Sequence, residues 1–308
     1  YLGQNGVLNN KATLQVKDNA SISVTDNQPG KVFNEGMIVK AEGNGSASLV
    51  ARVENKGSVK ADAGSLLIYN ALFLDGGKVE AGNGRVEMPS QSGVVLEVAE
   101  NATGTVKSGA TFVMSYGTLQ GSGTWKVEGL MVWRSGSMEG TGQTVIGQGA
   151  MLQLESGYDR YLRRTLVNEG TIVAQGVLYL GQNGVLNNKA TLQVKDGASI
   201  SPEGTGRRTL INAGTVVKSE GNGTAYISVE LRNEGKVRVA AGTLRVSDYY
   251  QTQTGTLEIG IGGTQSGQFG QMNVTGTAWL NGTLSAELLN DFSPDVGTDW
   301  LVCKFANL

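Results

Sequence analysis

The sequence predicts an all-β chain in which short strands stack coil upon coil, as a single-stranded, right-handed parallel β-helix (a β-solenoid). Three observations predict this fold: a long internal repeat, a shorter rhythm of glycine corners, and a composition with 46 glycines, 4 prolines and no histidine among 308 residues. Glycine costs roughly 1 kcal/mol relative to alanine inside a helix, whereas short strands with glycine at their corners accommodate it. We expect about 22 residues per coil, about 13–14 coils and a C-terminal cap.

The long repeat is exact where it begins. Residues 1–18, YLGQNGVLNNKATLQVKD, recur letter for letter at residues 179–196, and the same shift of 178 residues places EGNG at 42–45 over EGNG at 220–223. Self-similarity at a fixed period indicates a repeat architecture. The expected segments are a first eight-coil repeat at 1–178, a second, incomplete repeat continuous with it at 179–290, and a C-terminal cap at 291–308.

The shorter rhythm places a small residue, nearly always glycine, two positions before an apolar one. Successive small residues are 24, 21, 20, 27, 19, 19, 28 and 20 residues apart, which add to 178, and the series then starts again with 24, 21, 20 and 27. Irregular spacings that return in the same order predict that each small residue marks one coil. The two longest intervals predict side loops at residues 89–104 and 156–164, and loops on a rigid scaffold often carry function.

Asparagine often stands two positions before these glycines. We expect glycine to provide a positive φ angle at the corner, and stacked asparagines to pass side-chain amide bonds from coil to coil. Ligand binding by these asparagines is the alternative. The residues predicted to form structural corners are Asn34, Gly36, Asn55, Gly57, Asn168, Gly170, Asn212, Gly214, Asn233 and Gly235.

Apolar and polar residues alternate after each glycine, which turns one side chain inward and the next toward solvent. The alternation predicts that Trp125, two residues after Gly123, lies in the core. It predicts that three other aromatic residues point outward, where they could bind carbohydrate or another copy of the chain: Trp133, Tyr226 and Trp279.

One polar cluster stands out. The stretch RRTLVN at 163–168 returns as RRTLIN at 207–212, 44 residues or two coils later, which predicts a row of arginines on one edge. Arginine holds carboxylate, sulfate or phosphate groups bidentately, and tyrosine can stack on a sugar. The predicted anion or glycan patch comprises Tyr158, Arg160, Tyr161, Arg163, Arg164, Arg207 and Arg208. The alternative is a solvated corner in which Glu155, Glu169 or Glu203 pairs with these arginines.

The sequence contains no motif for several classes of function. The net charge of −2 argues against attraction to nucleic acid, and no apolar stretch of about 18 residues is present to span a membrane. The single cysteine, Cys303, excludes an intramolecular disulfide. We find no metal-binding pattern, no cofactor motif and no carboxylate pair that recurs at one coil position, and without histidine the commonest general base is absent. We therefore expect no catalysis, no metal and no cofactor.

Residues 255–305 carry a resemblance. They include GTLEI at 255–259, GGT at 262–264, QMNVTG at 271–276, LNGTL at 280–284 and FSPDVG at 292–297. This stretch resembles the closing module of large secreted bacterial parallel β-helix surface proteins, the autotransporter-like passenger and adhesin class. The resemblance implies an extracellular or cell-surface location. Pro294, Trp300 and Phe305 are suited to closing the core there, because an uncapped end would expose unpaired strand edges.

These observations favour a structural, adhesive extracellular rod that binds surface glycans or associates with its own copies, end to end or laterally. Because Tyr1 begins in the middle of a unit that returns at Tyr179, we expect the sequence to belong to a longer surface protein or fibre. The alternative is a carbohydrate-active β-helix enzyme of the polysaccharide lyase or hydrolase type. Such an enzyme needs at least two carboxylates within about 10 Å of each other in a groove.

Overall fold

The computed structural model describes residues 1–3, 5–25 and 30–307, and no helix is present in these ranges. The strands run parallel and stack as a β-solenoid with about 12 turns of about 21 residues each. The predicted all-β parallel β-helix is therefore confirmed, with slightly fewer and slightly shorter turns than the glycine spacing indicated. By its contacts the chain divides into two compact units. Unit 1 contains residues 1–153 and 163–165, and unit 2 contains residues 154–162 and 166–308.

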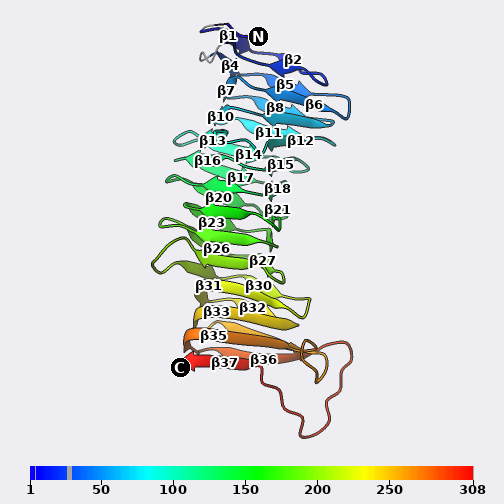
Figure 1. Ribbon diagram of the computed structural model, residues 1–308, viewed down its shortest axis with the longest axis vertical. Helices are drawn as coiled ribbons and strands as arrows, with labels where there is room; N and C mark the ends of the chain where they lie inside the picture. Colours follow the sequence, from blue (N-terminus) through cyan, green and yellow to red (C-terminus); the bar gives the residue numbers. More distant parts are fainter. Residues whose placement is uncertain (4, 26–29, 308) are drawn as a thin grey trace. The chain divides into compact units, whose positions relative to one another are not determined.

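In unit 1 each strand pairs with the strand three places further along the chain, so that three strands and three corners make one turn. Figure 1 shows these strands lying beside one another in sequence order. The first row is β1 (Val7–Asn10), β4 (Lys31–Asn34), β7 (Arg52–Asn55), β10 (Ala71–Leu74), β13 (Val95–Val98), β16 (Thr118–Gly121) and β19 (Gly136–Met138). The second is β2 (Thr13–Gln15), β5 (Met37–Lys40), β8 (Ser58–Ala61), β11 (Lys78–Ala81), β14 (Thr103–Val106), β17 (Thr124–Val127) and β20 (Gln143–Ile146). The third is β3 (Ser21–Ile22), β6 (Ser46–Leu49), β9 (Ser65–Ile68), β12 (Arg85–Met88), β15 (Thr111–Met114) and β18 (Leu130–Trp133).

Unit 2 begins with the same pattern and then joins two rows into longer strands. The ten-residue strand β31 (Thr224–Asn233) pairs with both β28 (Ser199–Pro202) and β29 (Thr209–Asn212). The rest of these rows is β22 (Asp159–Leu162), β25 (Val177–Leu180), β26 (Val185–Asn188), β33 (Gly242–Gln251), β35 (Gly270–Trp279) and β37 (Cys303–Asn307). The remaining row is β24 (Thr171–Ala174), β27 (Thr191–Val194), β30 (Thr215–Lys218), β32 (Lys236–Val239), β34 (Thr256–Ile261) and β36 (Thr283–Leu288). The strands β21 (Met151–Leu154) and β23 (Thr165–Asn168) contain residues of both units.

The alternation of the sequence decides which side chains form the core. In β4, Val32 and Asn34 are buried while Lys31 and Phe33 lie outward and half-exposed. Each fully buried aliphatic side chain contributes roughly 1.5–3 kcal/mol. Trp125 is fully buried, as predicted, and its ring meets that of Phe112 edge-on with the ring centres 5.3 Å apart.

The predicted loop at 156–164 is wrong. The 28-residue interval between Gly142 and Gly170 contains four strands, β20 to β23, where other intervals contain three. The additional strand is β22, which pairs in register with β25. Among the described residues, β26 is therefore 25 strands after β1, its counterpart in the 178-residue repeat, which is one strand more than eight turns of three strands. In the interval before Gly104, residues 95–98 form β13 and β14 begins at Thr103, so only residues 89–94 and 99–102 lie outside the strands.

The corner glycines are required for a different reason from the one we predicted. None of Gly36, Gly57, Gly214 and Gly235 is among the residues with positive φ. Instead, successive turns approach so closely that a Cβ on Gly57 would lie 1.9 Å from the carbonyl oxygen of Gly36, and one on Gly235 would lie 2.2 Å from that of Gly214. Only a residue without a side chain fits this spacing without a shift of the backbone.

The segment between β36 and β37 is a long loop in Figure 1. Pro294 is exposed and does not close the core, because it lies in this loop and not on a strand. Trp300 is half-buried and donates a hydrogen bond from Nε1 to the carbonyl oxygen of Gly263 at 2.9 Å, and its ring meets Phe292 edge-on. Phe305 is half-buried on β37, opposite Val274.

Candidate functional site

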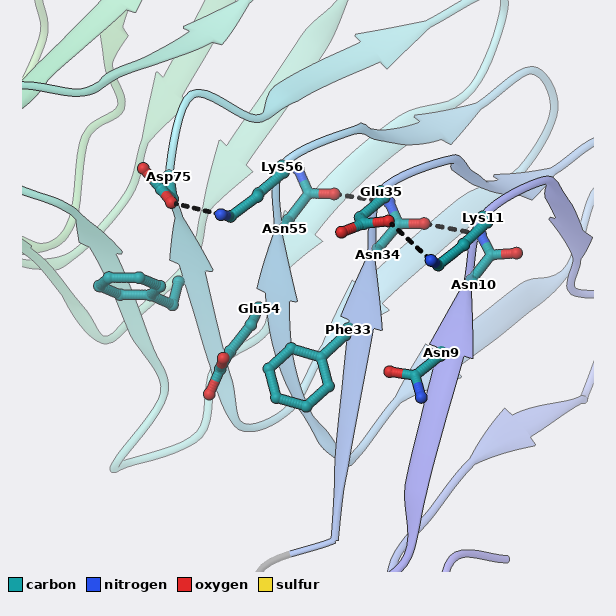
Figure 2. Close-up of a pocket in the computed structure, with 11 residues that line it drawn as sticks. Asn9, Asn10, Lys11, Phe33, Asn34, Glu35, Glu54, Asn55, Lys56 and Asp75 are labelled. Atoms are coloured by element: carbon teal, nitrogen blue, oxygen red, sulfur yellow. Dashed lines mark hydrogen bonds and ion pairs between the residues drawn. The ribbon is translucent and has the colours of Figure 1, made fainter.

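Unit 1 carries a groove of about 490 Å³ on the outward side of its first four turns. Figure 2 shows its lining, with Phe33 and Glu54 standing outward from neighbouring strands and the corner side chains along one edge. In the strand register Asn9, Phe33, Glu54 and Phe73 lie opposite one another on β1, β4, β7 and β10. Because adjacent strands lie about 4.8 Å apart, the backbones carrying the two phenylalanines are about 10 Å apart, with the glutamate between them.

Two cations hold the glutamate at the centre of this row. The Glu54 carboxylate lies 3.3 Å from Lys31 Nζ and 3.5 Å from Arg52 Nε. Lys31 Nζ also lies 4.7 Å from the ring centre of Phe33, and the Arg52 guanidinium lies 5.8 Å from that of Phe73. Cation–π contacts of this kind orient both aromatic rings and stabilise that orientation modestly. The result is two ordered apolar surfaces on either side of a hydrogen-bond acceptor.

The edge of the groove carries two further ion pairs, drawn in Figure 2. Lys11 Nζ lies 3.8 Å from the Glu35 carboxylate, and Lys56 Nζ lies 3.2 Å from that of Asp75. Exposed pairs such as these contribute about 0–1 kcal/mol to stability. Their main effect is to place charged hydrogen-bonding groups beside the two aromatic rings.

Stacked asparagines also line the groove, at the corner ends of its strands. Asn10 Nδ2 donates to Asn34 Oδ1, and Asn34 Nδ2 donates to Asn55 Oδ1, both at 2.6 Å. In unit 2 a longer ladder runs from Asn168 through Asn188 and Asn212 to Asn233, with donor–acceptor distances of 2.6–2.8 Å. All four of its amides are fully buried. These amides hydrogen-bond to one another and to backbone carbonyls, so they join the turns instead of offering free groups to a ligand.

The corresponding row of unit 2 has different chemistry. Asn187 and Ile211 occupy the places that Asn9 and Phe33 take in the repeat, and the row continues through Arg232, Tyr250 and Trp279. The rings of Tyr250 and Trp279 are stacked with their centres 3.8 Å apart, and the Arg232 guanidinium lies 5.7 Å from the Tyr250 ring centre. We name these three residues the Tyr–Trp platform. A hydrogen bond from Arg232 to Glu230 raises the pKa of the guanidinium.

Two of the five arginines of the predicted patch are buried. Arg160 and Arg164 are buried, and their guanidinium groups donate to backbone carbonyl oxygens: Arg160 to Tyr158 at 2.9 Å, and Arg164 to Gly123 at 2.8 Å. Burial lowers the pKa of both groups to about 10, so both remain charged at neutral pH. The expectation that these two arginines face solvent is wrong, because they satisfy backbone groups at the corners.

The other members of that patch are half-exposed or exposed. Arg163 pairs with Glu139 in unit 1 at 3.3 Å, and Arg207 pairs with Glu230 in unit 2 at 3.6 Å. Arg208 donates to the carbonyl oxygen of Arg207. In unit 2 the Tyr161 ring stacks on Tyr179, with ring centres 5.4 Å apart. Tyr158 is exposed.

Of the three aromatic residues predicted to point outward, Trp133 is fully buried and the prediction is wrong. It ends β18, where its Nε1 donates to the carbonyl oxygen of Ser135 at 2.9 Å. Tyr226 is half-exposed and Trp279 is exposed. Sequence reasoning missed Phe33 and Phe73. The signal was available, since both precede the last residue of a strand and lie outward by alternation.

Sequence reasoning also missed a pair of buried lysines, one in each repeat. Lys218 Nζ lies 2.5 Å from the Asp196 carboxylate and donates to the carbonyl oxygen of Gly221 at 3.2 Å. Lys40 makes the same contacts with Asp18 and with the Gly43 carbonyl oxygen at 3.1 Å. We call these two arrangements the lysine clasps. Both clasps use backbone groups of the EGNG segment, at 42–45 in the first copy and 220–223 in the second.

The clasps lower the pKa of both aspartate carboxylates. The hydrogen bond from Lys40 lowers the pKa of Asp18, and the Gly45 N–H also donates to it. Partial burial would raise the pKa of Asp196, but hydrogen bonds from Lys218 and the Gly223 N–H outweigh it, so that pKa is also lowered. Each clasp contains one aspartate carboxylate. Within the described ranges no three carboxylate or cysteine side chains come together as metal ligands do.

Comparisons with known proteins add no family. No protein-family model, no curated protein and no solved structure matches this chain. The residues described in the structure include no helix long and apolar enough to cross a membrane.

Proposed function

We propose that the chain is a structural, adhesive β-solenoid that acts at an extracellular surface and binds glycans through the groove of unit 1. The observation that carries this proposal is the row Phe33–Glu54–Phe73, two aromatic side chains about two strand spacings apart with a carboxylate between them. The apolar faces of sugar rings stack on aromatic side chains, and their hydroxyl groups bond to carboxylates, amides and ammonium groups. The groove presents all of these, at a volume typical of small-ligand sites.

The scaffold supports a mechanical role. Successive turns within each unit hydrogen-bond to one another, and asparagine ladders join them again through side chains. In such solenoids the stability is a sum over turns and their interfaces. Side chains mounted on stacked strands keep fixed spacings, which suits the recognition of a polymer with a regular repeat. Its place in a longer secreted surface protein of the autotransporter-like or adhesin class belongs to the same proposal, supported by the resemblance of residues 255–305.

The experiment is glycan binding by the intact chain, measured on an array of neutral and acidic oligosaccharides and then by calorimetry. The double variant Phe33→Ala/Phe73→Ala should weaken binding to the best glycan by about tenfold or more, since it removes both apolar surfaces. The matched control is Tyr116→Ala, because Tyr116 is an exposed aromatic residue of unit 1 outside the groove. Equal binding by all three proteins would contradict the assignment of the groove.

A carbohydrate-active enzyme is the second candidate, because three carboxylates line the same groove: Glu35, Glu54 and Asp75. Each of them is ion-paired with a lysine or arginine, whereas a general acid is usually held in an environment that keeps it protonated. The test is release of new sugar ends from polysaccharides. Release by the native chain that Glu54→Gln abolishes would favour the enzyme.

Association between copies is a separate part of the proposal. Sedimentation of the chain over a range of concentrations measures it directly. A constant monomer mass would restrict the proposal to glycan binding.

A further inference from the structure

A surface of unit 2 carries cations that no nearby carboxylate neutralises, whereas the carboxylates of the groove in unit 1 are ion-paired. On the first halves of the last long strands, four outward residues lie opposite one another in register: Tyr226 on β31, Arg245 on β33, Asn273 on β35 and Lys304 on β37. We name these residues the cationic row. Arg245 and Lys304 are both exposed, and Tyr226 is half-exposed.

The two cations of this row differ from most others in the chain. Within the part of the chain that the structure describes, neither Arg245 nor Lys304 has a carboxylate within ion-pair distance or any other polar partner. The second half of the same strands shows the usual arrangement, in which Glu230 pairs with Arg207 and with Arg232. Nothing in the row itself neutralises the guanidinium and the ammonium group.

The strand segments that carry the row are polar and contain no acidic residue. No aspartate or glutamate occurs in the strand segments 224–228, 243–247, 270–275 and 303–307. The outward neighbours are hydroxyl and amide side chains, of which Thr224, Thr243 and Gln271 are opposite one another in register. Such a surface offers hydrogen bonds to sugar hydroxyls and does not repel an anion.

We propose that the cationic row binds an anionic polysaccharide whose sugar rings carry carboxylate or sulfate groups. Arg245 and Lys304 are two strands apart, about 10 Å, so they can meet two acidic groups on one chain that crosses the strands. Arginine can bind such a group bidentately, Asn273 lies between the two cations, and the Tyr226 ring extends the row by one strand. The ligand class rests on the proposed glycan function, but the site is separate from the groove.

The same row is a poor match for nucleic acid. Binding to a phosphate backbone depends on neutralising many closely spaced phosphates, typically 6–10 contacts. The cationic row supplies two unpaired cations on a chain with a net charge of −2. Wider charge spacing and many hydroxyl groups are features of acidic polysaccharides.

The test is binding of the intact chain to immobilised polygalacturonate, which carries carboxylates, to dextran sulfate, which carries sulfates, and to neutral dextran. Binding to at least one of the two acidic polymers and not to dextran is expected. The variant Arg245→Ala/Lys304→Ala should weaken it by about tenfold or more. Whichever acidic polymer binds more tightly identifies the acidic group.

The matched control is Lys78→Ala, because Lys78 is an exposed lysine of unit 1 without an ion-pair partner among the described residues. Its binding should equal that of the native chain. Equal losses in Lys78→Ala and in the double variant would show only general charge attraction and would overturn the site, as would unchanged binding by the double variant. Tighter binding to double-stranded DNA than to either acidic polymer would overturn the ligand class. Circular dichroism of each variant shows that the fold is kept.

The two glycan proposals can fail separately. The Phe33→Ala/Phe73→Ala variant should keep its affinity for the acidic polymers, and the Arg245→Ala/Lys304→Ala variant should keep its affinity for the glycan of the groove. If the groove binds no glycan but the native chain still binds the acidic polymers, only the proposal for the cationic row stands.

Discussion

The same eighteen residues occur twice in this chain, and they have different surroundings in the two units. In unit 2, Leu186 and Leu192 are fully buried, because β26 and β27 have a paired strand on each side. In unit 1, Leu8 and Leu14 on β1 and β2 are only half-buried, and the described pairing is with the following turn. Identical sequence therefore gives similar strands, although β2 is one residue shorter than β27, and a different extent of burial.

The polar contacts of this repeated stretch differ in the same way. Asn188 accepts a hydrogen bond from Asn168 and donates one to Asn212, whereas Asn10 donates to Asn34. Lys189 pairs with Glu169 on the preceding turn, while Lys11 pairs with Glu35 on the following one. A side chain of a solenoid takes its partners from neighbouring turns, so its role depends on which turns are adjacent.

The largest expected difference between the two copies is in core packing. Leu186→Ala should lower the free energy of unfolding by about 2–5 kcal/mol, because it leaves a cavity in a filled layer. Leu8→Ala should lower it by about 1 kcal/mol, since that side chain is already partly in water. Urea denaturation of both variants measures the difference. Equal losses would show that the position in the stack does not matter.

The asparagine ladders should show a smaller difference of the same sign. Asn188→Ala removes a residue that serves as both donor and acceptor in a buried ladder, at a cost of about 2–3 kcal/mol. Asn10→Ala breaks a single link between side chains and should cost about 1 kcal/mol less. Thermal unfolding of the two variants compares them. Hydrogen exchange of the amides in β23 and β29 shows whether the loss is local to the ladder.

The lysine clasps should show no difference between the units, because each is made within equivalent parts of the repeat. A folded-state pKa below the unfolded value means that the carboxylate stabilises the fold above the unfolded pKa, about 3.9 for aspartate, and that this stability is lost as the pH falls through the lowered folded value. The transition temperature of the native chain should therefore fall as the pH decreases below about 4.

Asp18→Asn and Asp196→Asn should each lower the transition temperature by a few degrees at neutral pH. Each should also make the transition temperature depend less on pH in the acid range. The measurement is differential scanning calorimetry at a series of pH values. A flattened profile in only one variant would show that the two clasps are not equivalent.

Much of the fold follows from periodicity alone. The glycine spacing and the alternation of apolar residues predicted parallel coils, and the buried Trp125 follows from its place two residues after Gly123. Stacked asparagines could be anticipated because Asn34 and Asn55, like Asn212 and Asn233, precede consecutive corner glycines. The additional strand β22 could not, because a strand of four residues and a loop of similar length have similar composition.

Less of the candidate sites than of the fold could be predicted from the sequence. In the sequence Arg160 and Arg164 resemble surface residues, but each donates hydrogen bonds to backbone carbonyl oxygens at a corner. The groove at Phe33 and Phe73 depends on residues 40 positions apart that strand register places two turns apart. Register depends on the length of every corner between them, so a pattern within one coil does not fix it.

The sequence by itself determined that this chain forms parallel coils with glycine at the corners and apolar side chains inside, because those features repeat within each coil and depend only on local geometry and burial. Only the tertiary structure decided which outward side chains lie together, and which charges are neutralised by a neighbour or left unpaired. Contacts between turns join residues about 20 positions apart, and their identity depends on the exact stacking of one turn on the next.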